Sequence, residues 1–274
     1  MKRKLLVLFT FICSACAYSQ PVIIAHRGDN KFAPENSIEA ACIAWKNGLK
    51  FVECDIYETP AGMVCIHGKW ELKSLAGCEK EIAQLTEEDL KTLNLANNKK
   101  WGGKFQTVRI PTLDQIMATV PADGTLVLEM KSYSQAYAKK VDDARKAAGL
   151  KKEQILLISF DANAIKDFNS KYKGYKSLWL YSVRFENGKY IPTSDEAVKK
   201  CREIGAMGVN IGNSGLIGAD YVYEVKKSGM KFYVWTVNSR EEFMRLMNLG
   251  VDGITTDFGS DFTKTFAGLK RIKM

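Results

Sequence analysis

The chain contains only two histidines, His26 and His67, and each closes a short β-rich run. His26 follows residues 22–25 and precedes Arg27 and Gly28. An imidazole exchanges protons near neutral pH, and a guanidinium can hold a phosphate through two parallel hydrogen bonds. A lone histidine in a strand is more often structural, but the adjoining arginine favours proton transfer beside an anionic group.

Charged side chains are spaced two residues apart in two further β-rich runs. Glu53 and Asp55 therefore face the same side of one strand, and Glu129 and Lys131 share a side of another. Two inward carboxylates repel each other unless a cation lies between them, and oxygen ligands suit Ca²⁺ or Mg²⁺. We predict one divalent cation held by Glu53, Asp55 and Glu129. The alternative is that the acids lie near a rim and pair with arginine or lysine.

His67 ends the run 63–67, which follows the turn-forming residues 59–62. This order predicts a hairpin that returns His67 to the rim where Glu53 lies. Two histidines beside one phosphorus fit in-line displacement, since one can take a proton from the attacking oxygen and the other can donate one to the leaving alkoxide. Lys131 either supplies positive charge to a phosphate oxygen or forms only a salt bridge with Glu129.

β-rich runs alternate with helical patterns from residue 22 onward, which is typical of repeated βα units. The predicted strands cover residues 22–26, 51–57, 125–131, 155–160, 177–182, 208–212, 231–237 and 253–257. The first helix is expected over residues 37–47, with Asn36 as its cap, Glu39 completing a capping box and Gly48 ending it. Eight units predict an α/β fold, a closed (β/α)8 TIM-type barrel, because a doubly wound sheet would place a glycine-rich phosphate turn after the first strand.

Residues 20–274 are predicted to form one barrel domain with an insertion at about residues 68–109, after the second βα unit. The insertion is either a partial lid over the pocket or a packing excursion that does not touch substrate. The net charge of +9 comes from 40 basic and 31 acidic residues that are scattered along the chain. This pattern excludes a dense nucleic-acid-binding stripe and suits either an anionic small-molecule substrate or a merely soluble surface.

Residues 1–19 predict an export signal, because three basic residues precede an apolar run that is too short to span a bilayer. Cleavage after Ser19 gives an exported chain, periplasmic or extracellular, with no stable membrane insertion. The alternative is a lipoprotein anchored through Cys16, although Cys13 stands where a lipobox usually has a branched apolar residue.

Five cysteines follow Ser19, an odd number that cannot pair completely within the chain. A bridge between Cys65 and Cys78 and a set of buried free thiols both fit the sequence. The sequence gives no indication of oligomeric state.

Nine short motifs occur in order and cover nearly all of the mature chain. They are His26-Arg-Gly28, Pro34-Glu-Asn-Ser37, Glu53-x-Asp55, His67, Pro111-Thr-Leu113, Glu129-x-Lys131, Ser159-Phe160, Trp235-Thr-Val-Asn238 and Gly250-Val-Asp-Gly-Ile-x-Thr-Asp257. Each motif alone is weak evidence for a family, but together the nine motifs resemble those of the glycerophosphodiester phosphodiesterases.

The resemblance implies a TIM-type barrel that hydrolyses a glycerophosphodiester to sn-glycerol 3-phosphate and an alcohol. It also implies a cation on Glu53, Asp55 and Glu129, acid and base work by His26 and His67, phosphate contacts from Arg27 and Lys131, and a pocket lined by Trp235. Two positions depart from the family pattern. Gly68 stands where the family usually has aspartate, and the sequence after Asp257 lacks a common proline. We expect both departures to affect substrate choice or rate more than reaction type.

Two other functions remain open. A barrel lipase of the phospholipase D toxin type would act on phospholipid or lysolipid, and would show exposed apolar side chains around Trp70 or Trp101. A non-catalytic glycerophosphodiester-binding protein is favoured only by Gly68, and the presence of both histidines and all three carboxylates argues against it.

Overall fold

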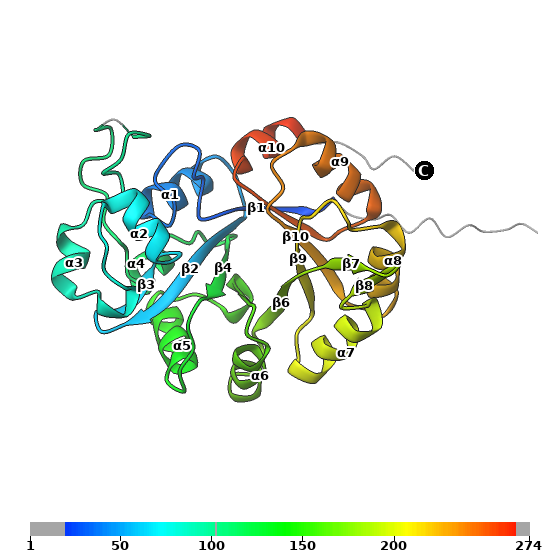
Figure 1. The fold of residues 1–274 in the computed structure, drawn as a ribbon. Coiled ribbons are helices and arrows are strands. Elements are labelled where there is room, and N and C mark those ends of the chain that lie inside the picture. Colours follow the sequence, from blue (N-terminus) through cyan, green and yellow to red (C-terminus); the bar gives the residue numbers. More distant parts are fainter. Residues whose placement is uncertain (1–19, 102, 267–274) are drawn as a thin grey trace, which may run out of the picture.

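Eight parallel strands form a closed barrel at the centre of the molecule (Figure 1). The computed structural model describes residues 20–101 and 103–266, so the predicted export signal lies outside the described residues. The barrel strands are β1 (Val22–Ala25), β2 (Phe51–Thr59), β4 (Thr125–Met130), β5 (Ile155–Ser159), β6 (Lys176–Ser182), β9 (Gly208–Gly212), β10 (Lys231–Trp235) and β11 (Gly253–Thr256). β1 pairs with both β2 and β11, which closes the ring and confirms the predicted (β/α)8 barrel.

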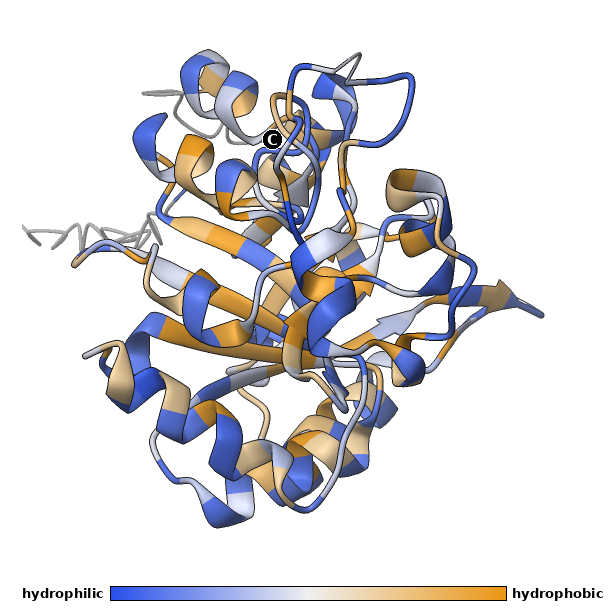
Figure 2. Cartoon of the chain, turned by 90° about the vertical axis from the view of Figure 1, so that its left-hand side faces the viewer, coloured by the Kyte–Doolittle hydropathy of each residue, from blue (hydrophilic) through white to orange (hydrophobic). Residues whose placement is uncertain are grey.

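One α-helix follows each strand unit and packs outside the barrel (Figure 1). These helices are α1 (Ile38–Lys46), α4 (Leu113–Met117), α5 (Tyr137–Ala147), α6 (Ala162–Lys171), α7 (Ser194–Ile204), α8 (Ala219–Lys227), α9 (Arg240–Leu249) and α10 (Gly259–Phe266), and a 3₁₀ turn, η2 (Lys152–Gln154), precedes β5. Their apolar stripes and the outward strand faces form the main core. Figure 2 shows the largely hydrophobic strands covered by helices of mixed hydropathy.

A smaller apolar cluster fills the inside of the barrel below its carboxyl end. Its members alternate along the strands with the residues of the outer core, as the period of two requires. They are Ile24, Val127, Leu156, Ile158, Leu178, Leu180 and Tyr233. Inward positions nearer the carboxyl ends of the strands carry polar residues instead, so the fold places its chemistry at that rim.

The first helix starts one residue later than expected, and the predicted cap is wrong. Ser37 is the N-cap, and its side chain accepts a hydrogen bond from the backbone N–H of Ala40. Asn36 instead adopts a left-handed backbone with φ of 56° and turns its side chain toward Asp55. The Asn36 side chain therefore bonds to Asp55 in the interior and does not cap the helix.

The five cysteines of the described chain are free thiols, so the Cys65–Cys78 bridge is wrong; the alternative of buried free thiols is confirmed for three of them, whereas Cys42 is exposed and Cys78 is half-buried. Cys54, Cys65 and Cys201 are buried. They behave as small apolar residues in the core.

The connection from β2 to α4 contains a hairpin and an additional helical unit. β3 (Gly62–Cys65) folds back antiparallel on β2. Then follow α2 (Lys69–Ala76), the 3₁₀ turn η1 (Ile82–Gln84) and α3 (Glu87–Thr92), with no strand in residues 69–101 or 103–109. This unit has its own apolar core, which includes Leu72, Leu85 and Leu95.

A second hairpin was not predicted from the sequence. β7 (Arg184–Glu186) and β8 (Lys189–Ile191) pair in the connection from β6 to α7. Within the described range, no helix has both the length and the apolar content that a membrane span requires.

Asp142 provides a test of how buried hydrogen bonds stabilise the layer of helices around the barrel. It is buried on α5 and accepts hydrogen bonds from Tyr175 (2.7 Å) and Arg145 (3.1 Å), and it pairs with Lys146 (2.6 Å). Burial opposes ionisation, but these partners outweigh it and lower the pKa of Asp142 to about 2. We expect Asp142→Ala to lower the free energy of unfolding by about 2 kcal/mol at pH 7, because charged hydrogen bonds are lost.

Because the folded pKa of Asp142 lies below the unfolded value, its contribution is present above about pH 4 and disappears as pH falls toward 2. Urea unfolding at both pH values measures this difference. The neighbouring Asp143→Ala, which removes a surface ion pair with Lys139, is the control and should change stability by less than about 0.5 kcal/mol. An Asp142→Ala deficit that is undiminished near pH 2 would contradict the assignment.

Candidate active site

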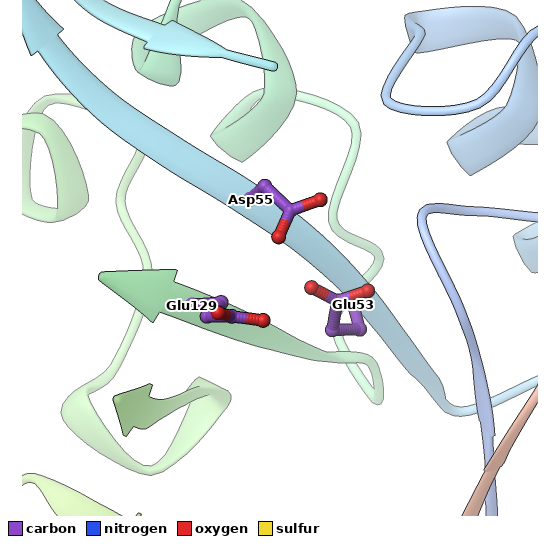
Figure 3. A group of neighbouring side chains, drawn as sticks. All are labelled: Glu53, Asp55 and Glu129. Carbon is purple, nitrogen blue, oxygen red and sulfur yellow. The ribbon is translucent and has the colours of Figure 1, made fainter. Parts of the chain in front are cut away.

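The predicted chemistry-bearing residues gather at the carboxyl end of the barrel because neighbouring strands are in register. Asp55 on β2 lies directly opposite Glu129 on β4. Glu53 lies two residues before Asp55 and faces the same side. Figure 3 shows the three side chains projecting from these two strands into a common space.

The three carboxylates form a compact group that could hold a metal ion. Each offers an oxygen, and these oxygens lie within 4.8 Å of one another. Glu53 and Asp55 are buried, yet Glu53 Oε1 and Asp55 Oδ1 have no hydrogen-bond partner. Buried carboxylate oxygens without partners are costly, and a hard cation such as Mg²⁺ or Ca²⁺ would satisfy them. The donor set therefore fits the predicted cation.

The three carboxyl groups differ strongly in their pKa values. Burial disfavours ionisation of Glu53 and Glu129, and the charge of Asp55 adds repulsion. The pKa of Glu53 is raised to about 8, and that of Glu129 is raised above its ordinary value. Burial acts on Asp55 in the same sense, but the hydrogen bond to His67 and the charge of Arg27 outweigh it and hold the pKa of Asp55 well below its usual range.

Arg27 connects the acidic group to one histidine. Its backbone is left-handed, with φ of 54°, and its N–H donates to Glu53 Oε2 at 2.8 Å. Its guanidinium donates to Glu35 (2.9 Å) and to His67 Nδ1 (3.0 Å), with Nε 3.1 Å from Asp55 Oδ2. An arginine in this conformation is strained, and the surrounding contacts hold it there.

Gly28 makes this turn possible. Its φ is +80°, and a Cβ at this position would lie 2.6 Å from the Cβ of Ala40 on α1. The Gly28 N–H also donates to the backbone oxygen of Glu53 at 3.1 Å. Only glycine satisfies both the backbone angle and the close approach to the helix.

The two histidines have different hydrogen-bond partners. His26 Nδ1 lies 2.7 Å from Asp257 Oδ1, so this nitrogen donates and Nε2 of neutral His26 is left as an acceptor. His67 Nδ1 faces the Arg27 guanidinium at 3.0 Å, and because that group can only donate, this contact favours the neutral tautomer with its proton on Nε2. Asp55 Oδ2 is also 3.3 Å from His67 Nδ1 and can accept from that nitrogen once the ring is protonated.

His26 is a good proton acceptor in this setting. Burial alone would lower its pKa, but the hydrogen bond to Asp257 and the nearby charge of Glu53 outweigh burial and raise it. Asp257 is itself held by the side-chain amides of Asn30 and Asn238, each at 2.6 Å.

Lys131 and Trp235 lie on different sides of the rim. Lys131 Nζ donates to Glu129 Oε1 at 2.8 Å and lies 3.5 Å from Asp55 Oδ1, so the salt bridge considered from the sequence is present. Trp235 ends β10, donates from Nε1 to the backbone oxygen of Asn210 and packs edge-on against Phe160 at 5.6 Å. β10 lies apart from β2 and β4 in the strand order, whereas Phe160 follows β5, the neighbour of β4.

A cavity of about 450 Å³ opens beside His26. Its lining is rich in charge and includes one residue of the insertion. The lining residues are His26, Arg27, Asn30, Lys31, Glu35, Lys100, Asp257 and Phe258. Lys100 also donates to the backbone oxygen of Asn30 at 3.0 Å, so the insertion reaches the rim of the barrel.

Sequence reasoning assigned no role in the site to Asp257, Glu35, Asn36 or Glu71. A signal for Asp257 exists, because it ends the last predicted strand as His26 ends the first. Ala25 pairs with Thr256, so His26 and Asp257 are the next pair along the two strands. Glu71 has no such signal, since it lies in the first turn of α2 within the insertion.

A closed β/α barrel that gathers two imidazoles, a guanidinium and three carboxylates at its carboxyl rim has the architecture of a barrel hydrolase. The chain matches the glycerophosphoryl diester phosphodiesterase family model over residues 26–260. It is 30% identical over 241 residues to the glycerophosphodiester phosphodiesterase of Caldanaerobacter subterraneus subsp. tengcongensis, covering 86% of this chain and 93% of that protein. The chain therefore belongs to the glycerophosphoryl diester phosphodiesterase family and is a phosphoric diester hydrolase.

Solved structures share the fold. A glycerophosphodiester phosphodiesterase from Parabacteroides distasonis aligns with a TM-score of 0.71 and 25% identity, covering 90% of this chain and 96% of that chain. A phosphodiesterase from Oleispira antarctica, solved in complex with the product sn-glycerol-3-phosphate, aligns with a TM-score of 0.73 and 21% identity, covering 90% and 97%.

The His26–Asp257 contact yields a direct test. We expect Asp257→Asn to lower kcat on a glycerophosphodiester by about 10²-fold or more, because an amide cannot hold the imidazole as the carboxylate does or stabilise its protonated form. Steady-state kinetics of the purified variant measure the loss. Asp261→Asn, which removes only a partly exposed pair with Lys31, is the matched control. Equal rates for the two variants would contradict a role for Asp257.

Proposed function

We propose that this enzyme hydrolyses glycerophosphodiesters to sn-glycerol 3-phosphate and an alcohol, with one divalent cation and two histidines. The observation that carries the proposal is the group of three carboxylates within 4.8 Å, linked through Arg27 to His67. The crystallised relative from Oleispira antarctica, whose product is sn-glycerol-3-phosphate, supports the product class.

Glu53, Asp55 and Glu129 would hold Ca²⁺ or Mg²⁺, and the ion would compensate negative charge on the phosphate. Arg27 and Lys131 supply further positive charge beside the acids, which stabilises the anionic substrate at the rim. Lys31 and Lys100 extend this charge along the cavity, so the insertion acts as a pocket wall or partial lid.

The hydrogen bonds of the two rings suggest their roles. His26 has a free acceptor at Nε2 and a carboxylate behind it, so it takes the proton of the attacking oxygen. His67 carries its proton on Nε2 and can pass it to the leaving alkoxide, while Asp55 stands beside its other nitrogen. Trp235 and Phe160 form an aromatic wall for the glycerol or the leaving alcohol.

We further propose that the protein is exported, on the strength of residues 1–19, whose composition fits a cleaved signal. The periplasm or the extracellular space would then be the site of action.

The decisive experiment offers the purified enzyme a panel of glycerophosphodiesters and measures released glycerol 3-phosphate with and without chelator. Chelation is expected to abolish turnover and Mg²⁺ or Ca²⁺ to restore it, because the buried acids need a counter-ion. His26→Ala and His67→Ala should each lower kcat by about 10²- to 10⁴-fold.

A p-nitrophenyl diester provides the internal control of this panel, because its leaving group needs no proton. His67→Ala should be far less damaging on this substrate, whereas His26→Ala should slow both substrates. Chelator-resistant turnover, or full activity of either variant on alkyl diesters, would refute the proposed mechanism.

Hydrolysis of lysolipid or phospholipid is a second candidate, favoured by one observation. Of the seven exposed large hydrophobic residues in the described chain, six lie in connections that follow the carboxyl ends of barrel strands, on the catalytic face. These six are Phe32, Trp70, Phe160, Phe185, Ile191 and Leu216. Trp70 is 72% exposed, whereas Trp101 is 8% exposed and does not contribute. Exposed apolar side chains around a catalytic pocket suit an amphiphilic substrate.

This candidate predicts that activity on lysolipid micelles depends on the exposed rim. Trp70→Ser and Phe160→Ser should each reduce turnover of a lysolipid more than turnover of a water-soluble head-group diester, since apolar contact is lost. Tyr223→Ser on α8, which is equally exposed but lies outside the catalytic face, is the control. If all three variants behave alike on both substrates, water-soluble diesters remain the preferred class.

A further inference from the structure

Glu71 is a fully buried carboxyl, 0% exposed, for which the proposed mechanism has no use. It is the third residue of α2, counted from the cap residue Gly68. At this position an acid usually bonds the N–H of the cap residue itself, as part of a capping box. Glu71 instead accepts a hydrogen bond from the backbone N–H of His67, one residue earlier.

The segment that carries His67 has little other support. β3 ends at Cys65 and α2 begins at Lys69, so His67 lies in a link between two elements. The preceding residue, Ile66, is tied to the backbone oxygen of Asp55 at 3.0 Å. The Glu71 contact therefore fixes the His67 peptide, while Arg27 fixes its ring at Nδ1.

The same carboxyl joins two other groups near the acidic cluster. Asn36 Nδ2 donates to Glu71 Oε1 at 3.0 Å and to Asp55 Oδ2 at 2.9 Å. Glu35, which accepts from the Arg27 guanidinium, lies close enough to Glu71 to influence its ionisation. Burial and the neighbouring Glu35 raise the pKa of Glu71 well above its ordinary value.

We propose that Glu71 is a positioning residue that sets the place of His67 in the reaction. It acts through the His67 backbone, and through Glu35 it supports the Arg27 guanidinium that holds the His67 ring. This inference rests on the proposed catalytic role of His67. It assigns Glu71 no contact with substrate or ion.

Three substitutions separate positioning from simple stability. Glu71→Gln keeps an acceptor for the His67 N–H and resembles a protonated acid toward Glu35, so kcat should remain within about 3-fold of wild type. Glu71→Leu removes both functions, and Glu71→Asp keeps the carboxyl group but shortens the side chain by one methylene. We expect Leu and Asp to lower kcat by about 10- to 100-fold with KM changed by less than about 3-fold, as for residues that orient a catalytic group.

Glu196 supplies the matched control. It is the corresponding third residue of α7, accepts from the N–H of the cap residue Thr193 at 2.8 Å and is exposed. Glu196→Gln, →Leu and →Asp should leave kcat unchanged. Circular dichroism identifies any unfolded variant, and Glu71→Asp serves as the test if Glu71→Leu does not fold.

A double-mutant cycle with His67→Ala decides the question. If Glu71 acts through His67, Glu71→Asp should slow the wild-type enzyme but cause no further loss in the His67→Ala background. Equal losses in both backgrounds, or wild-type kcat in both Glu71→Asp and Glu71→Leu, would overturn the inference. Full activity of His67→Ala by itself would overturn the proposed function as well, whereas a slow His67→Ala with fully active Glu71 variants overturns only the role of Glu71.

Discussion

The crowding of three carboxylates, two of them buried, in the mouth of the barrel is the constraint on which the site depends. Their repulsion must be balanced, and Arg27 and Lys131 balance it chiefly at Asp55. Glu53 and Glu129 are left with raised pKa values and, at Glu53, an oxygen without a partner. This arrangement is one that a divalent cation would complete, and the left-handed backbone of Arg27 brings its N–H to Glu53.

Strand geometry explains how much of this arrangement the sequence could predict. Glu53 and Asp55 share a face because the period of a strand is two, and that rule needs no tertiary information. The pairing of Asp55 with Glu129 requires the register between β2 and β4. The contact of His26 with Asp257 requires the barrel to close, so that the first and last strands become neighbours. Sequence pattern identified the strands but could not supply these two registers.

The wrong cap assignment at Asn36 and the missing assignment at Glu71 have a common physical origin. Both residues stand next to helix starts, where local rules assign them to capping. In the folded chain their side chains are buried and bond to each other and to the segment around His67. Buried polar groups must find partners, and this demand outweighs a cap worth about 1 kcal/mol. Predictions from local sequence therefore fail most often where polar side chains near the site are buried.

The departure from the family pattern at Gly68 can be understood in the same terms. The resemblance leads one to expect an aspartate directly after His67, and its absence suggested a loosened histidine. A Cβ at Gly68 would meet only the Tyr57 hydroxyl, at 3.9 Å, so the position is open and no packing forbids a side chain there. The acid three residues later instead reaches the His67 backbone from within the first turn of α2. A carboxylate therefore still contacts the backbone of this turn. Gly68 by itself does not argue that catalysis has been lost.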